Sequence, residues 1–125
     1  MFELEKAFFF EAGHVLKHHD GKCKNPHGHS YQLLIKVRSP TLISSGPKTN
    51  MVMDFFDIST IVKKMIEEYF DHKWVNDTLN TDSATSEFMC KWIFDHLDPQ
   101  LNGLYRVTLY ETASSKASYT KEGSQ

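Results

Sequence analysis

Two segments near the start of the chain alternate apolar and polar side chains, which is the pattern of a strand with one buried face. The apolar positions are mostly phenylalanine in residues 2–11, and in residues 30–38 they are Tyr31, Leu33, Ile35 and Val37. Residues 17–26 between them are polar and too numerous for a tight hairpin turn. We therefore expect two strands joined by a long loop, and loops of this length are often functional.

Two helices and two further strands are predicted downstream. Asp54 is a suitable N-cap for a helix over residues 54–70, where apolar residues recur at helical spacing. Thr85 or Ser83 could cap a second helix over residues 85–97, and Glu87 could complete a capping box there. Alternation then predicts strands over residues 104–112 and 117–120.

This order of elements predicts an α+β domain, in which a four-stranded antiparallel sheet carries two helices on one face. A chain of 125 residues with 40% hydrophobic residues suffices for one core. We expect a single domain over residues 1–120 and a flexible tail over residues 121–125.

Charge and composition exclude several classes of function. The formal net charge is −2 and the basic residues form no run, so we expect no nucleic-acid partner. Glu3, Glu5 and Lys6 interrupt the apolar residues near the start, so we expect neither a signal peptide nor a membrane span. Seven histidines and only two cysteines fit a cytoplasmic protein in which these residues serve metal binding or catalysis.

Three histidines stand where the first two strands should meet. His27 and His29 are two residues apart, so their side chains lie on the same face of a strand, and His14 lies just past the end of the other strand. Three imidazoles suit zinc or another borderline divalent ion and leave a fourth position open for water or substrate. Cys23 could instead close the site as a fourth ligand, or the histidines could be ordinary polar loop residues.

Several separated motifs resemble the 6-pyruvoyl-tetrahydropterin synthase family. Cys23 with the His-Gly-His of residues 27–29, preceded by residues 10–14, resembles the zinc site of that family. Its later signatures are matched in order by residues 51–55, 71–76, 85–87 and 110–112 and by Tyr119. The resemblance covers residues 2–120. The short spacing from Cys23 to His27 and the compact chain are more similar to the 6-carboxy-5,6,7,8-tetrahydropterin synthases of queuosine-precursor synthesis than to the pyruvoyl-forming enzymes of animals.

The resemblance implies roles for particular residues. His14, His27 and His29 would hold zinc, which would act as a Lewis acid on the side-chain hydroxyls of 7,8-dihydroneopterin triphosphate. Cys23 would be the general base, and Asp71 and His72 would complete a proton relay. Glu111, assisted by Thr112, would accept hydrogen bonds from the pterin ring. By contrast, we expect Cys90 to be a core residue.

The resemblance also implies the T-fold, in which sheets of several subunits join into a barrel, and a homohexamer made of two trimers with sites at subunit interfaces. The expected products are 6-carboxytetrahydropterin, acetaldehyde and triphosphate. The alternatives are a pyruvoyl-forming lyase that eliminates triphosphate and a non-catalytic zinc- or pterin-binding module. One departure from the family is Asn50, which replaces a glycine and should tolerate a left-handed backbone.

Overall fold

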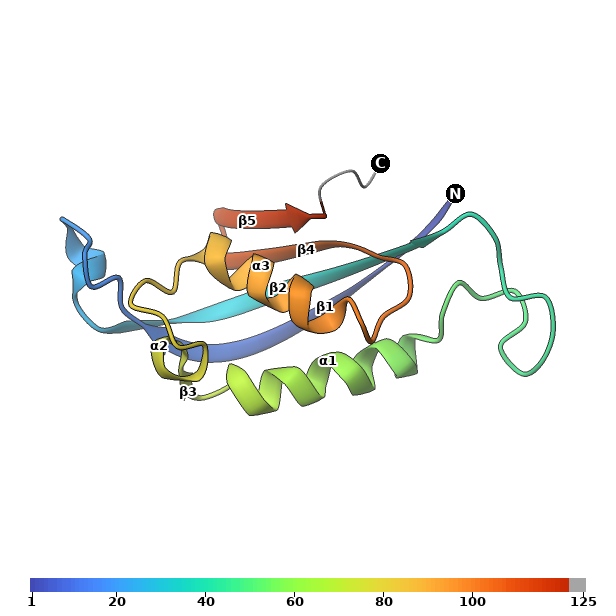
Figure 1. Ribbon diagram of the computed structural model, residues 1–125, viewed down its shortest axis with the longest axis horizontal. Helices are drawn as coiled ribbons and strands as arrows, with labels where there is room; N and C mark the ends of the chain where they lie inside the picture. Colours follow the sequence, from blue (N-terminus) through green and yellow to red (C-terminus); the bar gives the residue numbers. More distant parts are fainter. Residues whose placement is uncertain (122–125) are drawn as a thin grey trace.

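The computed structural model describes residues 1–121, which form a twisted sheet and the helices packed on it (Figure 1). The longer elements occur in the order β, β, α, α, β, β, as the sequence predicts, with short elements between them. Their bounds are β1 Phe2–His14, a 3-10 turn Lys22–Lys24, β2 His27–Ser39, α1 Phe55–Tyr69, β3 Lys73–Trp74, α2 Val75–Thr78, α3 Ser86–Leu97, β4 Leu104–Thr112 and β5 Ser115–Thr120.

The sheet has the strand order β3-β1-β2-β4-β5 within the described residues. Strands β1, β2, β4 and β5 pair antiparallel, which confirms the four-stranded antiparallel sheet. The fifth strand, β3, is an addition: it has two residues, pairs parallel with β1 at Ala12 and Gly13, and is too short to show any periodicity in the sequence. Strands β1 and β2 are also longer than expected, because their pairing continues to the opposed pair His14 and His27.

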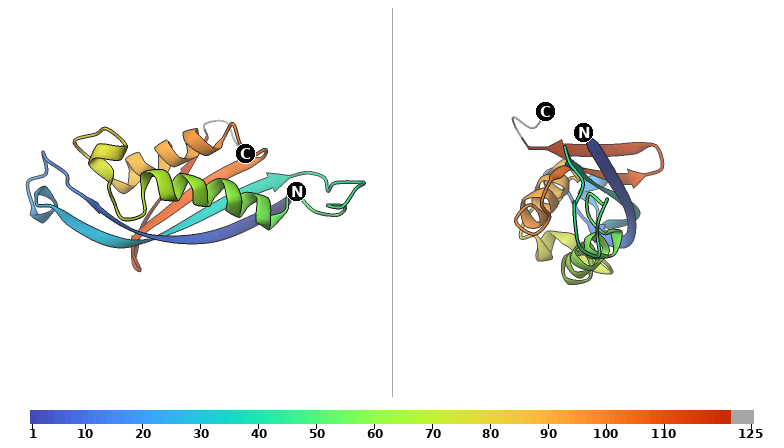
Figure 2. Two further views of the ribbon diagram at one scale, coloured as in Figure 1. Left: turned by 90° about the horizontal axis from the view of Figure 1, so that it is seen from below. Right: turned by 90° about the vertical axis from the view of Figure 1, so that its right-hand side faces the viewer.

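Helices α1 and α3 lie on the same face of the sheet, as predicted (Figure 2). Each begins at an expected cap: the Asp54 carboxylate accepts from Phe56 N at 2.8 Å, and the Thr85 hydroxyl accepts from Phe88 N at 3.1 Å. Phe88 therefore occupies the position where a capping box needs Glu or Gln. The capping-box role predicted for Glu87 is wrong, because Glu87 stands one residue too early in the helix.

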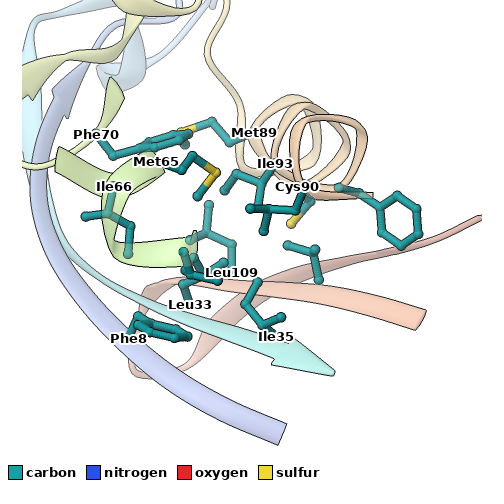
Figure 3. Close-up of a cluster of buried hydrophobic side chains, with 14 of the residues drawn as sticks. Phe8, Leu33, Ile35, Met65, Ile66, Phe70, Met89, Cys90, Ile93 and Leu109 are labelled. Carbon is teal, nitrogen blue, oxygen red and sulfur yellow. The ribbon is translucent and has the colours of Figure 1, made fainter. Parts of the chain in front are cut away.

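Side chains from both helices and the inner sheet face form one core (Figure 3). Leu33 and Ile35 of β2 meet Met65 of α1 and Ile93 of α3, and all four are at most 2% exposed. Cys90 belongs to this core, as expected. Burial of this apolar face holds the sheet rigid, so the ends of β1 and β2 present their side chains in fixed positions.

Three further observations concern features predicted from the sequence. Asn50 has φ of 68°, so this asparagine adopts the left-handed conformation expected of it. Lys121 donates to the Asp98 carboxylate at 3.0 Å, and residues 122–125 of the expected tail lie outside the described part of the chain. Among residues 1–121, no helix has the length and apolar character needed to cross a bilayer.

Candidate metal centre

The hairpin of β1 and β2 brings His14, His27 and His29 to one point on the inner sheet face. His14 and His27 are opposed across the two strands, and His29 lies two residues further along β2 on the same side. One ring nitrogen from each histidine lies within 4.8 Å of the other two. The three rings are in edge contact, with centroids 4.4 to 5.1 Å apart.

Backbone carbonyls fix the tautomers of two of these rings. His14 Nδ1 lies 2.7 Å from the Ala84 carbonyl oxygen, and His27 Nδ1 lies 2.7 Å from that of Asn25. Because a carbonyl only accepts, Nδ1 carries the proton in both rings, and each Nε2 of a neutral ring presents a lone pair. Such hydrogen bonds from the second ring nitrogen are typical of metal-binding histidines.

The Nε2 lone pairs of the three histidines point toward one another, an arrangement that a bound cation would stabilise. His14 Nε2 and His27 Nε2 are only 2.8 Å apart, so two lone pairs face each other unless a proton or a metal ion lies beside them. His29 Nε2 is buried and has no hydrogen-bond partner among the described residues. Burial also lowers the pKa of His14, which favours the neutral form that a metal ligand needs. These three residues therefore fit a divalent metal ion.

Glu111 of β4 lies next to the cluster and supplies negative charge. One carboxylate oxygen is 3.6 Å from His29 Nε2, and the other is 3.9 Å from His14 Nε2. The Ser86 hydroxyl donates to Glu111 Oε2 at 3.2 Å and so orients the carboxylate. The motif of residues 85–87 is the sequence signal for Ser86, but by residue type alone it predicts only a helix cap.

A cavity of about 710 Å³ joins Glu111 to the predicted general base. Cys23, Ser86 and Glu87 are among its other lining residues. Cys23 is half-buried in the 3-10 turn and does not belong to the cluster of closely spaced ligand atoms found in the described residues, which consists of the three histidines. This placement favours an open site over one closed by the thiolate. Thr112 is exposed at the end of β4 and does not line the cavity.

Asp71 and His72, the predicted relay residues, do not line the cavity that contains Cys23. The Asp71 carboxylate accepts from Glu11 N at 3.0 Å and lies 3.2 Å from His72 Nδ1. The Glu11 N–H, more than any other contact, lowers the pKa of Asp71 and keeps it ionised. His72 lines a separate cavity of about 520 Å³ that shares no lining residue with the cavity of Cys23. A single chain thus does not assemble this pair with Cys23.

The sequence pattern predicts Tyr31 only as an apolar residue of the second strand, yet its ring forms a wall of the cluster. Its ring centroid is 5.5 Å from that of His29 and 6.2 Å from that of His14. Its hydroxyl is buried and has no hydrogen-bond partner among the described residues. Burial and, secondarily, Glu111 raise the pKa of Tyr31, so the phenol remains a proton donor.

Comparison with known proteins agrees with this geometry. The profile of the family described as 6-pyruvoyl tetrahydropterin synthase matches residues 3–122. The chain is 40% identical over 120 residues to the 6-carboxy-5,6,7,8-tetrahydropterin synthase of Synechocystis, covering 95% of this chain and 93% of that protein. It is 36% identical, in an alignment 141 residues long, to the Haemophilus influenzae protein of the same name; the alignment covers 95% of this chain and 99% of that protein. The structure of Caenorhabditis elegans 6-pyruvoyl tetrahydropterin synthase superposes with a TM-score of 0.81 at 26% identity, covering 96% and 95%.

The sheet, the two helices on one face and the three-histidine cluster beside a carboxylate define an α+β T-fold protein with a candidate metal centre. The chain belongs to the 6-pyruvoyl tetrahydropterin synthase family. The two curated relatives described above are both named as synthases of a tetrahydropterin.

Proposed function

We propose that this protein is a zinc-dependent 6-carboxy-5,6,7,8-tetrahydropterin synthase. It would convert 7,8-dihydroneopterin triphosphate and water into 6-carboxytetrahydropterin, acetaldehyde and triphosphate, as a step toward queuosine. The observation that carries the proposal is the convergence of the Nε2 atoms of His14 and His27 with the Nε2 of His29, which has no hydrogen-bond partner among the described residues, beside a cavity that contains Cys23 and Glu111. The names of the curated relatives support the choice of product.

Bound zinc would supply Lewis acidity, which makes a carbon-bound proton next to a coordinated hydroxyl easier to remove. Glu111 would accept hydrogen bonds from the ring N–H and the exocyclic amino group of the pterin, with Thr112 assisting. Ser86 holds one oxygen of Glu111 and so limits the rotation of the carboxylate. Cys23, in the same cavity, would take the proton from the substrate side chain.

Assembly would bring in the remaining residues. Within residues 1–121 the sheet has two open edges: β5 is unpaired on its outer side, and β3 covers β1 only at Ala12 and Gly13. Open edges favour pairing with further copies, and we propose the homohexamer of two trimers that the resemblance implies. Asp71 and His72 lie beside the β1 edge, so they would complete the Cys23 site of a neighbouring subunit.

Product analysis by mass after incubation with 7,8-dihydroneopterin triphosphate tests the reaction. The proposal predicts triphosphate, acetaldehyde and 6-carboxytetrahydropterin in equal amounts. A pyruvoyl product without acetaldehyde would identify the alternative lyase. Absence of triphosphate release would contradict both enzymes and leave a binding module.

The role of Cys23 has a separate test. A Cys23→Ala variant should keep its zinc and lose turnover, because the thiol is not a ligand in this proposal. In the cobalt-substituted wild-type protein, a strong thiolate-to-cobalt absorption band would show that Cys23 closes the metal shell and would contradict its role as a free base.

A further inference from the structure

Residues 71–76 follow the end of β1 almost residue by residue. The Asp71 carboxylate holds Glu11 N, strand β3 pairs with Ala12 and Gly13, and the side chain of Asn76 binds both backbone groups of Val15. His14 lies between these last two points of attachment. The same segment therefore carries the proposed relay residues and fixes the backbone on both sides of a metal ligand.

Asn76 is the buried anchor of this arrangement, with 5% of its surface exposed. Its Oδ1 accepts from Val15 N at 2.8 Å, and its Nδ2 donates to the carbonyl oxygens of Val15 and Thr81, each at 2.9 Å. One acceptor faces an N–H and two donor hydrogens face two carbonyls, so the partners fix the orientation of the amide. The side chain is satisfied entirely by backbone groups of two segments, the distant end of β1 at Val15 and the nearby loop at Thr81.

The second of these segments leads directly to the hydrogen-bond partner of His14. Thr81 N donates in return to the Asn76 carbonyl at 2.9 Å, so Asn76 holds Thr81 through both its backbone and its side chain. Three residues later, the Ala84 carbonyl accepts from His14 Nδ1 at 2.7 Å. Between them, Ser83 bridges to Leu16 of the chain that continues from β1.

We propose that Asn76 is a positioning residue for the metal centre. It sets the position of His14 through Val15 and the position of the Ala84 carbonyl through Thr81, without contacting the metal itself. Loss of its amide frees the ring and its carbonyl acceptor to move independently. This inference rests on the proposed metal site and assigns metal affinity to a residue outside the ligand shell.

The test compares metal affinity in two variants and a matched control. Asn76→Ala removes all three side-chain hydrogen bonds, and Asn76→Asp keeps the shape and an acceptor but removes both donors. The control is Thr78→Ala in the same short helix, because the hydrogen bonds of the Thr78 hydroxyl within residues 1–121 go to the carbonyls of Tyr69 at 2.6 Å and Val75 at 3.5 Å, not to Val15 or Thr81. Unfolding of each metal-free protein by urea measures the loss of stability.

Zinc affinity is measured by competition with a chelator, and the geometry of the site by the absorption bands of bound cobalt. We expect both Asn76 variants to bind zinc about 10- to 100-fold more weakly, the range found when groups that orient metal ligands are removed. Their cobalt bands should broaden or shift. The Thr78→Ala protein should lose stability and keep wild-type affinity and bands.

Two results would contradict the positioning role of Asn76. A folded Asn76 variant with wild-type zinc affinity and cobalt bands would overturn the positioning role, and so would an equal loss of affinity in the Thr78→Ala control. A wild-type protein that binds neither metal would instead overturn the metal centre and the proposed function with it.

Discussion

Replacing Tyr31 by phenylalanine should stabilise the metal-free protein. The Tyr31 side chain is 1% exposed, and its hydroxyl has no hydrogen-bond partner among the described residues. A buried polar group without a partner costs about 1–3 kcal/mol relative to its hydrated state. The substitution keeps the ring and its stacking on Phe10, where the centroids are 5.1 Å apart, so little packing is lost. We therefore expect the free energy of unfolding to rise by about 1–3 kcal/mol.

The measurement is urea unfolding of metal-free wild type and Tyr31→Phe at one protein concentration, because assembly makes apparent stability depend on concentration. Tyr69→Phe is the control: Tyr69 is half-buried, and its hydroxyl is not among the buried unpartnered atoms of the described residues. That control should change stability by no more than about 0.5 kcal/mol. A Tyr31→Phe protein less stable than wild type would refute the reasoning, since it would show that the hydroxyl has a partner such as a water bridging to Glu111.

Three further outcomes are expected. Burial raises the pKa of Cys90 to about 12, so a thiol reagent at pH 8 should label Cys23 in the native protein and Cys90 only after unfolding; rapid labelling of both would contradict this. Because the folded state favours the protonated Cys90 thiol, its contribution to stability is complete below the unfolded pKa of 9.0 and falls as pH rises toward 12; a Cys90→Ala protein should show a flatter loss of stability across that range in alkaline unfolding curves, and an unchanged slope would count against it. Glu111→Gln should weaken pterin binding about 10-fold or more, because a carboxylate that accepts two hydrogen bonds becomes an amide; calorimetric titration with the pterin would measure this, and unchanged affinity would exclude Glu111 as the anchor.

Periodicity in the sequence was sufficient to predict the main elements, because most of the buried face of each lies at regular intervals. It missed the full length of β1 and β2, since Gly13, Gly28 and the histidines carry no apolar signal. Strand β3 exists because Asp71 and Asn76 hold the chain beside β1 at either end, and such side-chain contacts have no periodicity.

The sequence predicted the three histidines of the site but not their hydrogen-bond partners or the position of Asp71 and His72. Spacing placed His27 and His29 on one face, and the pairing of the two strands brought His14 to them. The carbonyls of Ala84 and Asn25 fix the tautomers through backbone atoms, so no residue type in the sequence marks them. The sequence motifs did not indicate that Asp71 and His72 lie outside the cavity of Cys23, because that depends on which side of β1 their segment packs.

Recovery of activity as zinc is added to the metal-free protein tests the central proposal most directly. Triphosphate release from 7,8-dihydroneopterin triphosphate is followed while zinc is added in fractions of an equivalent per chain. With His14, His27 and His29 as the ligands of one ion in each chain, the rate should rise in proportion to zinc and level off at one equivalent. A metal-free protein that already turns over at the full rate would contradict the proposal.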